Sequence, residues 1–336
     1  MERVAPALRV SEPTRNPMRQ TDTLSRRAFL ASLAAAGAAA VLRPPRAAAY
    51  PGPATQSTRP GPLLTRPIPS SGEAIPLVGL GSWSTFNVGD DVAARDVCAE
   101  VMRAFFAGGA RLIDSSPMYG SSQEVIGYGL KKLGHPKQLF SADKVWISSG
   151  EKGPEQIRES ERRWGVTRFN LLQVHNLMAW EEHLRTLFAM KAAGKLGYVG
   201  ITTSHGRRHD ELEKVMRAQP IDFVQLTYNV VDREVEQRLL PLARERKIAV
   251  ICNRPFDGGD LFDRVGRAPL PAWAAEIDCA NWAQVLLKFI VSHPAVTCAI
   301  PATSRVDHVK ENVGASYGRL PDEAMRRRIV TEVEKL

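Results

Sequence analysis

Cysteine is scarce in this chain, and its spacing excludes the common cysteine-based sites. The 336 residues include four cysteines, Cys98, Cys252, Cys279 and Cys298. None belongs to a C-x-x-C pair or a Cys/His cluster, so zinc motifs and thioredoxin-like redox motifs are excluded. Cys98 falls in a predicted helix, and Cys252 and Cys298 fall in predicted strands. We therefore expect no metal site and mostly buried free thiols.

A complete dinucleotide-binding glycine motif is also missing. A Rossmann fold requires the pattern G-x-G-x-x-G after its first strand, with an acidic residue about 20 positions later. The nearest match, Val78-Gly79-Leu80-Gly81-Ser82-Trp83, has no third glycine. The Rossmann fold is therefore rejected as the architecture of this chain.

Outside its first 49 residues the chain carries only a small net charge. The formal net charge is +9, but residues 1–49 hold eight arginines against three acidic residues, a net of +5. The remaining residues therefore carry +4. Aromatic residues make up 7% of the chain, and no basic stripe has aromatics interleaved with it. A nucleic-acid partner is not expected.

Residues 1–49 have the pattern of an export signal. Arg26 and Arg27 precede an uncharged run over 28–42, and the small residues 47–49 follow Arg46. This pattern is typical of a twin-arginine signal peptide. The 15-residue run is too short for a comfortable transmembrane helix. A basic amphipathic arm is the alternative, but it fits poorly because the run is apolar all round.

The signal predicts export by the twin-arginine translocation machinery into the periplasm or another space outside the cytoplasm. No stable membrane anchor is expected. Residues 50–62 are rich in Pro, Gly, Ser and Thr without periodicity, which is typical of a flexible linker. The folded part is then residues 63–336.

Short apolar runs alternate with helical patterns throughout residues 63–336, which is the signature of repeated βα units. Eight alternations predict one closed (β/α)8 TIM barrel, and the length suits a single domain of this kind. A hairpin over 64–68 and 74–77 comes first. The predicted barrel strands are 78–83, 111–115, 139–145, 169–175, 197–202, 223–228, 249–253 and 295–300. Helices are predicted over 94–107, 181–193, 210–218, 233–246, 282–292 and 322–335.

Four chemically distinctive residues lie at or just after the ends of three of these strands. Asp114, Lys144 and His175 come at strand ends, and Tyr119 follows in the loop after Asp114. Taken singly, each such residue is usually structural or merely solvated. In a barrel, however, active sites gather at the carboxyl ends of the strands. The four side chains are therefore expected to converge.

Together these residues could protonate a carbonyl oxygen. A free tyrosine has a pKa of about 10, so its proton leaves reluctantly near neutrality. The ammonium group of Lys144 would favour the phenolate of Tyr119 and lower its pKa. Asp114 would hold Lys144 in place and keep it charged. A neutral His175 could orient and polarise the carbonyl.

This set, with its Asp-x-x-x-x-Tyr-Gly spacing over 114–120, resembles the catalytic tetrad of the aldo/keto reductases. The resemblance covers roughly residues 63–318. It implies reduction of aldehydes or ketones to alcohols, or the reverse, with Tyr119 as general acid/base assisted by Lys144, Asp114 and His175. It also implies NADP(H) rather than NAD(H), and a hairpin that covers the N-terminal end of the barrel.

The resemblance extends to three cofactor-binding segments. Thr202, Thr203 and Gln225 match the positions that hold the nicotinamide carboxamide, with Thr203 replacing the usual asparagine. The segment after the seventh strand would stack on the nicotinamide and approach the pyrophosphate; it offers Arg254, in place of the usual aromatic, with Phe256, Gly258 and Gly259. The segment after the eighth strand would hold the adenosine and its 2′-phosphate; it offers Thr303, Ser304, Arg305, His308, Glu311 and Asn312.

The substrate pocket is the least constrained part of the prediction. Trp83 matches a tryptophan at the pocket wall of the family, and Phe86, Met118 and Trp180 are further candidates, although ordinary packing accounts for these three at least as well. An apolar pocket without an anion clamp favours a hydrophobic or aromatic carbonyl compound or alcohol. A monomer is expected rather than an oligomer. An exported cofactor-binding, redox-sensing or regulatory module with little turnover is the alternative function.

Overall fold

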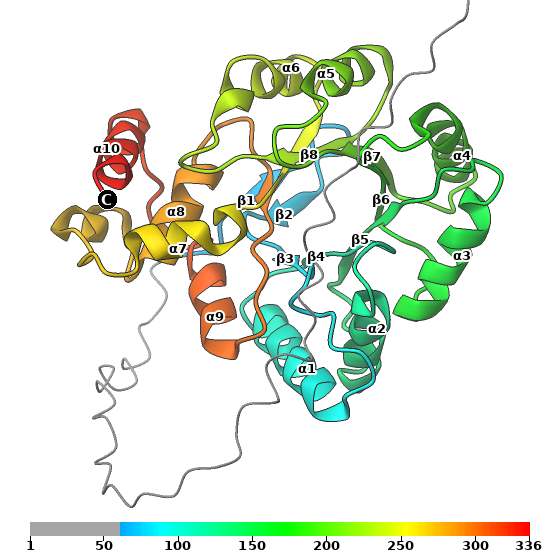
Figure 1. Ribbon diagram of the computed structural model, residues 1–336, viewed down its shortest axis with the longest axis horizontal. Helices are drawn as coiled ribbons and strands as arrows, with labels where there is room; N and C mark the ends of the chain where they lie inside the picture. The colour runs from blue at the N-terminus through cyan, green and yellow to red at the C-terminus, as the bar shows by residue number, and fades with distance from the viewer. Residues whose placement is uncertain (1–60) are drawn as a thin grey trace, which may run out of the picture. The chain divides into compact units, whose positions relative to one another are not determined.

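The computed structural model describes residues 61–336, so the predicted export signal and most of the linker lie outside the described part. Figure 1 looks down the barrel, with strands in the centre and helices around them. The eight parallel strands pair in chain order. They are β3 (Leu80–Gly81), β4 (Leu112–Asp114), β5 (Phe140–Val145), β6 (Leu171–His175), β7 (Tyr198–Thr202), β8 (Phe223–Thr227), β9 (Ala249–Asn253) and β10 (Cys298–Ala299).

The first and last strands meet and close the barrel. Parallel bridges join Val78 to Ala299 and Gly81 to Ala302, and the Gly81 amide donates to the Pro301 carbonyl at 2.9 Å. Glycine is required at this seam, because a Cβ on Gly81 would lie 2.8 Å from the carbonyl oxygen of Ile300. The glycines that resemble part of a dinucleotide motif therefore serve strand packing. The predicted (β/α)8 barrel is confirmed.

Helices follow the strands and cover the outside of the barrel. They are α1 (Val92–Ala107), α2 (Ser122–Lys132), α3 (Gly153–Trp164), α4 (Trp180–Ala192), α5 (His209–Ala218), α6 (Leu239–Glu245), α7 (Asp260–Val265), α8 (Trp282–Val291), α9 (Val306–Gly314) and α10 (Glu323–Glu334). Short 3₁₀ turns lie at Glu234–Glu236, Asp257–Gly259 and Ala272–Ile277. α1 and α8 begin where Asp91 and Asn281 accept the amides of Ala94 and Gln284, the usual role of an N-cap side chain.

One helix prediction is wrong. The continuous helix expected over 233–246 is instead a 3₁₀ turn followed by α6, with non-helical backbone at Arg238 between them. Pro241 explains the interruption, because proline has no amide proton to donate and its ring clashes with the carbonyl four residues earlier. The helix restarts so that Pro241 falls in its first turn, where no donor is needed.

An antiparallel hairpin covers the N-terminal end of the barrel. It consists of β1 (Thr65–Pro67) and β2 (Ala74–Pro76). Ile68 and Ile75 are fully buried and belong to a cluster with the inward-facing strand residues. Those strand residues are Leu112, Phe140, Ala142, Leu171, Phe223, Ala249, Ile251, Cys298 and Ile300. The hairpin thus closes this end with apolar side chains, as predicted.

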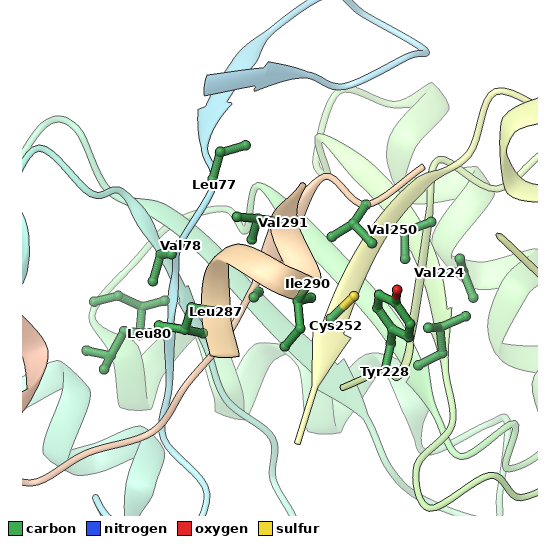
Figure 2. Packing of buried hydrophobic residues seen from close by; sticks show 14 of the residues in the cluster. Leu77, Val78, Leu80, Val224, Tyr228, Val250, Cys252, Leu287, Ile290 and Val291 are labelled. Atoms are coloured by element: carbon green, nitrogen blue, oxygen red, sulfur yellow. The ribbon is translucent and has the colours of Figure 1, made fainter. Parts of the chain in front are cut away.

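A second apolar layer lies between the strands and the helices. In Figure 2, Leu287, Ile290 and Val291 of α8 pack among side chains from the strands, including Cys252 of β9. The four cysteines are buried and free, as expected. Among the helices of residues 61–336, none is both long and apolar enough to cross a bilayer.

Candidate active site

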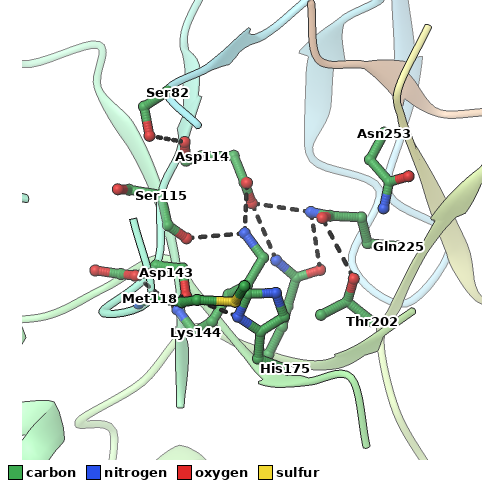
Figure 3. Close-up of polar contacts among 12 residues, drawn as sticks. Ser82, Asp114, Ser115, Met118, Asp143, Lys144, His175, Thr202, Gln225 and Asn253 are labelled. Atoms are coloured by element: carbon green, nitrogen blue, oxygen red, sulfur yellow. Dashed lines mark hydrogen bonds and ion pairs between the residues drawn. The ribbon is translucent and has the colours of Figure 1, made fainter. Parts of the chain in front are cut away.

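The carboxyl ends of the strands form one end of the barrel, here called the mouth. Asp114 ends β4, His175 ends β6, and Lys144 is the second-to-last residue of β5. Asp114, Tyr119 and His175 line a cavity of about 380 Å³ at the mouth, and Lys144 lies buried directly behind them. The predicted convergence of the four side chains is therefore observed. Figure 3 shows three of them, Asp114, Lys144 and His175, side by side.

Lys144 and Asp114 form a buried ion pair. The distance from Lys144 Nζ to Asp114 Oδ2 is 2.5 Å, and Nζ also donates to the Ser115 carbonyl at 2.8 Å. Both side chains are almost completely inaccessible. Burial alone would lower the pKa of Lys144, but the nearby charge of Asp114, with Tyr119, raises it above the usual value. Asp114 thus keeps the ammonium charged, as the sequence argument expects.

Asp114 is held by partners that the sequence argument did not identify. Its Oδ1 atom accepts hydrogen bonds from Gln225 at 2.9 Å and from Gln173 at 3.2 Å. Its backbone carbonyl accepts the Ser82 hydroxyl at 2.8 Å. Gln173 carried one usable signal: it lies two positions before His175 in a strand, so both side chains point to the same face. Because His175 was expected at the active site, Gln173 on the same face of β6 was a candidate for the same region.

Tyr119 lies against the ammonium group of Lys144. The distance from Nζ to the centre of the phenol ring is 5.0 Å. Burial raises the pKa of Tyr119, while the charge of Lys144 lowers it; burial has the larger effect, so the pKa lies above its usual value. The expected lowering by Lys144 is therefore present, but burial outweighs it. Tyr119 remains protonated near neutrality and can serve as a proton donor.

His175 is neutral and fixed in orientation. Its ring lies edge-on to the ring of Tyr119, with centres 5.7 Å apart and planes at 87°. Its Nδ1 atom is 2.7 Å from the hydroxyl oxygen of Ser116. Burial, helped by the charge of Lys144, lowers the pKa of His175 to about 3. The imidazole is therefore uncharged over the working range of most enzymes and can donate through one nitrogen.

Two of the three residues predicted to bind the carboxamide line the cavity, and the third does not. Thr202 and Gln225 line the cavity, and the Thr202 hydroxyl lies 3.3 Å from Gln225 Oε1. Thr203 is buried and does not line the cavity; its carbonyl accepts the side-chain amide of Asn253 at 2.8 Å. Asn253 itself lines the cavity, although the sequence argument did not place it there.

The segment after β9 contributes Arg254, Phe256, Gly258 and Gly259, which were predicted to contact the cofactor, to the cavity lining. The guanidinium of Arg254 forms an ion pair with Asp257 at 2.9 Å. Gly258 and Gly259 have φ values of 75° and 119°, which side chains disfavour. A Cβ on Gly258 would also lie 3.3 Å from the Arg254 guanidinium. Glycine here permits the left-handed backbone and leaves room for the arginine.

The residues predicted to bind adenosine lie in the segment before α9 and along that helix, close in sequence to Ala302 of the cavity lining. None of them lines the cavity itself. Arg305 is the residue before the helix, and its Nε atom donates to Asp307 at 3.1 Å. Thr303 and Asn312 are buried, whereas Ser304, Arg305 and His308 are exposed and Glu311 is half-buried. Their role in cofactor binding remains a prediction.

The predicted substrate-pocket residues fall into two groups. Trp83 and Met118 line the cavity and remain 51% and 43% exposed. Phe86 and Trp180, contrary to expectation, do not line it. Phe86 is fully buried in the core, and Trp180 begins α4, where its indole donates to Glu211 at 3.1 Å. Phe262, which the sequence argument overlooked, lies in the lining with its ring centre 4.6 Å from that of Phe256.

A closed (β/α)8 barrel with a cavity at the carboxyl ends of its strands, lined by Asp114, Tyr119 and His175, is the arrangement of a barrel enzyme. A model of the aldo/keto reductase family matches residues 77–329. The chain therefore belongs to the aldo/keto reductase family.

The relatives are reductases of moderate identity. The methylglyoxal reductase YeaE of Escherichia coli strain K12 is 28% identical over 244 residues, 71% of this chain and 84% of YeaE. An NADH-specific methylglyoxal reductase of the same organism is 26% identical, covering 59% of this chain and 68% of its own length. The structure of an aldo/keto reductase from Klebsiella pneumoniae in complex with NADP and acetate superposes with a TM-score of 0.63 at 22% identity, covering 77% of this chain and 93% of that one.

Proposed function

We propose that this chain is an NADP(H)-dependent oxidoreductase that reduces aldehydes or ketones to alcohols, or catalyses the reverse reaction. One observation supports the proposal most strongly. A charged lysine, a protonated tyrosine and a neutral histidine meet at one cavity, with the lysine held by a buried carboxylate. This arrangement suits proton delivery to a carbonyl oxygen and has no evident role in packing.

Each of the four residues has a defined task in the proposed reaction. When bound, the nicotinamide supplies a hydride to the carbonyl carbon. Tyr119 donates its proton to the carbonyl oxygen, which gives the alcohol and leaves a phenolate. The Lys144 ammonium stabilises that phenolate until solvent reprotonates it. His175 donates a hydrogen bond that orients the carbonyl, and Asp114 holds Lys144.

The cavity lining fits a dinucleotide. We propose that Gln225 and Thr202 hold the carboxamide, that the planar guanidinium of Arg254 stacks on the nicotinamide, and that the backbone at Gly258 and Gly259 approaches the pyrophosphate. The open space at Gly259, where no atom lies within 4 Å of a Cβ position, supports this assignment. NADP is bound in the Klebsiella relative. For the 2′-phosphate and adenine we propose the residues around the start of α9, with Arg305 as the principal cation.

The substrate would be a carbonyl compound with an apolar substituent. Trp83, Met118, Phe256 and Phe262 make much of the cavity wall apolar, and apolar surface in a pocket favours hydrophobic ligands. The two Escherichia coli relatives are named as methylglyoxal reductases. Methylglyoxal therefore belongs beside aromatic aldehydes in a substrate panel.

We also propose that the protein is exported by the twin-arginine pathway and acts outside the cytoplasm as a monomer. Twin-arginine signals serve proteins that fold before they cross the membrane, and no pool of free NADP is replenished outside. The cofactor would therefore be loaded before export and retained with a dissociation constant at or below roughly micromolar. Replacing Arg26 and Arg27 with lysine should leave folded, cofactor-bound protein in the cytoplasm.

Steady consumption of NADPH with a panel of aldehydes and ketones tests the enzymatic proposal. Many turnovers per protein molecule are expected for a reductase. A single stoichiometric burst would instead support the alternative of a redox-sensing or regulatory module. Arg305→Ala tests the phosphate assignment: it should weaken NADPH binding by roughly 1.5 to 3 kcal/mol and leave NADH binding almost unchanged. Equal weakening of both dinucleotides would show that Arg305 is structural.

A further inference from the structure

The hydroxyl group of Ser116 lies between the catalytic candidates and has two partners. Ser116 is fully buried in the segment that joins Asp114 to Tyr119. Its Oγ atom is 2.7 Å from Nδ1 of His175 and accepts the backbone amide of Met118 at 3.2 Å. A hydroxyl group has one proton to donate and two lone pairs that accept.

The directions of these two hydrogen bonds can be assigned. The Met118 amide can only donate, so this bond uses a lone pair of the Ser116 oxygen. Within residues 61–336, Nδ1 of His175 is the one recorded partner that can accept the Ser116 proton. If Nδ1 donated instead, the buried hydroxyl proton would have no acceptor there, which is unfavourable for a buried donor. In the favoured arrangement the Met118 amide donates to the Ser116 oxygen, and the Ser116 hydroxyl donates to Nδ1 of His175.

The tautomer of His175 follows from this chain of hydrogen bonds. The pKa of His175, lowered to about 3 by burial, means that the ring carries a single proton near neutrality. With Nδ1 accepting, that proton is on Nε2. Nε2 has no recorded hydrogen bond among the described residues, and His175 is part of the cavity lining. The ring therefore presents a donor to whatever occupies the cavity.

We propose that Ser116 is a positioning residue that fixes the tautomer of His175, so that Nε2–H can donate to the carbonyl oxygen of the substrate. The role in turnover rests on the proposed reductase function, whereas the tautomer assignment does not. The simpler alternative is a local turn, in which Ser116 serves only to accept the amide two residues later, as serine often does. A turn alone leaves the histidine tautomer unchanged when the hydroxyl is removed.

Nitrogen NMR of the full chain labelled with ¹⁵N in its histidine rings distinguishes these roles without requiring turnover. The chain has seven histidines, and the signals of His175 are those lost in His175→Gln. We expect Nδ1 to show the shift of a non-protonated ring nitrogen and Nε2 that of a protonated one. Ser116→Ala should move both signals towards a mixture of tautomers. A protonated Nδ1 in the unsubstituted protein would overturn the proposal, as would ring signals that Ser116→Ala leaves unchanged.

Ser122→Ala is the matched control. Ser122 is another fully buried serine in the same part of the chain, and its hydroxyl pairs with that of Ser115 at 2.9 Å rather than with a histidine. It should leave the His175 signals in place. Ser116→Thr keeps a hydroxyl group, so it should retain the tautomer that Ser116→Ala loses. Should Ser116→Ala not fold, the unsubstituted protein still tests the proposal: a protonated Nε2 of His175 supports it and a protonated Nδ1 overturns it.

Turnover gives a second readout. Ser116→Ala should lower kcat for carbonyl reduction by about 10-fold, the scale of one lost hydrogen bond, while the affinity for NADPH stays unchanged. Unchanged kcat in this variant would overturn the positioning role. If the unsubstituted protein reduces no carbonyl compound, the proposed function is contradicted. The NMR test of the His175 tautomer does not depend on that outcome.

Discussion

The two ends of this barrel differ in the chemistry of their buried side chains, which are apolar at the N-terminal end and charged or polar at the mouth. The N-terminal end is closed by a hairpin whose Ile68 and Ile75 pack against an apolar cluster. The mouth instead holds the buried ion pair of Lys144 and Asp114, with glutamine amides bonded to the carboxylate. Apolar packing stabilises a fold, whereas buried charges must be paired to be tolerated. The contrast separates the part of the chain that holds the barrel together from the part that can perform chemistry.

The backbone shows the same contrast. Most of the non-glycine residues with left-handed φ values lie in segments that follow strands, on the side of the mouth: Ser84, Asn176, Leu177, Ala179, His205, Arg208, Arg254 and Asp257. At the other end, His135 and Lys247 precede strands. Such conformations are costly and gather at functional sites. We infer that these backbone conformations lower the stability of the fold but hold the side chains at the mouth in a fixed arrangement.

Breaking the ion pair should have the largest effect on stability. Asp114→Asn leaves the Lys144 ammonium buried without a counter-charge, so the free energy of unfolding should fall by about 3 to 5 kcal/mol. Reduction of carbonyl compounds should be lost as well. The double variant Asp114→Asn with Lys144→Met removes both charges, so in urea denaturation it should recover much of the stability while remaining inactive. A single variant as stable as the unsubstituted protein would contradict the account.

A change at the opposite end should affect stability without affecting chemistry. Ile75→Ala removes buried apolar atoms and leaves a cavity, which should cost about 2 to 4 kcal/mol of unfolding free energy. Its kcat at a temperature where it remains folded should equal that of the unsubstituted protein. Ile75→Val, the conservative control, should cost about 0.5 to 1.5 kcal/mol. A large loss of kcat in Ile75→Ala would show that the two ends are not separable.

Acid should reveal the titrating group at the mouth gradually, over several pH units. The pKa of His175 is about 3 in the folded chain, against an ordinary value of 6.5, so between these values the unfolded chain binds a proton that the folded chain does not. Stability from this group is therefore present above pH 6.5 and is lost as pH falls towards 3, by at most about 1.4 kcal/mol per pH unit. His175→Gln should flatten the urea-derived stability profile in this window. Parallel profiles for the two proteins would contradict this effect.

Local sequence patterns predicted the barrel because short apolar runs and helical periodicity repeat eight times. They also placed Asp114, Tyr119, Lys144 and His175 at one end, since strand ends in a barrel share an edge. The hydrogen bonds of Ser116 and Gln173 depend on contacts between different strands and could not be predicted from spacing. The direction of the Tyr119 pKa depends on a balance between burial and a nearby charge, which requires the folded structure.

The most direct test of the central claim, that Tyr119 delivers the proton at the mouth, is the rate of carbonyl reduction by Tyr119→Phe under saturating NADPH. This substitution keeps the ring and removes the hydroxyl group. The account predicts a fall of at least about 100-fold, the usual scale for a general acid, with unchanged NADPH affinity and unchanged stability in urea. A variant that reduces the same substrate at a rate near that of the unsubstituted protein would contradict it.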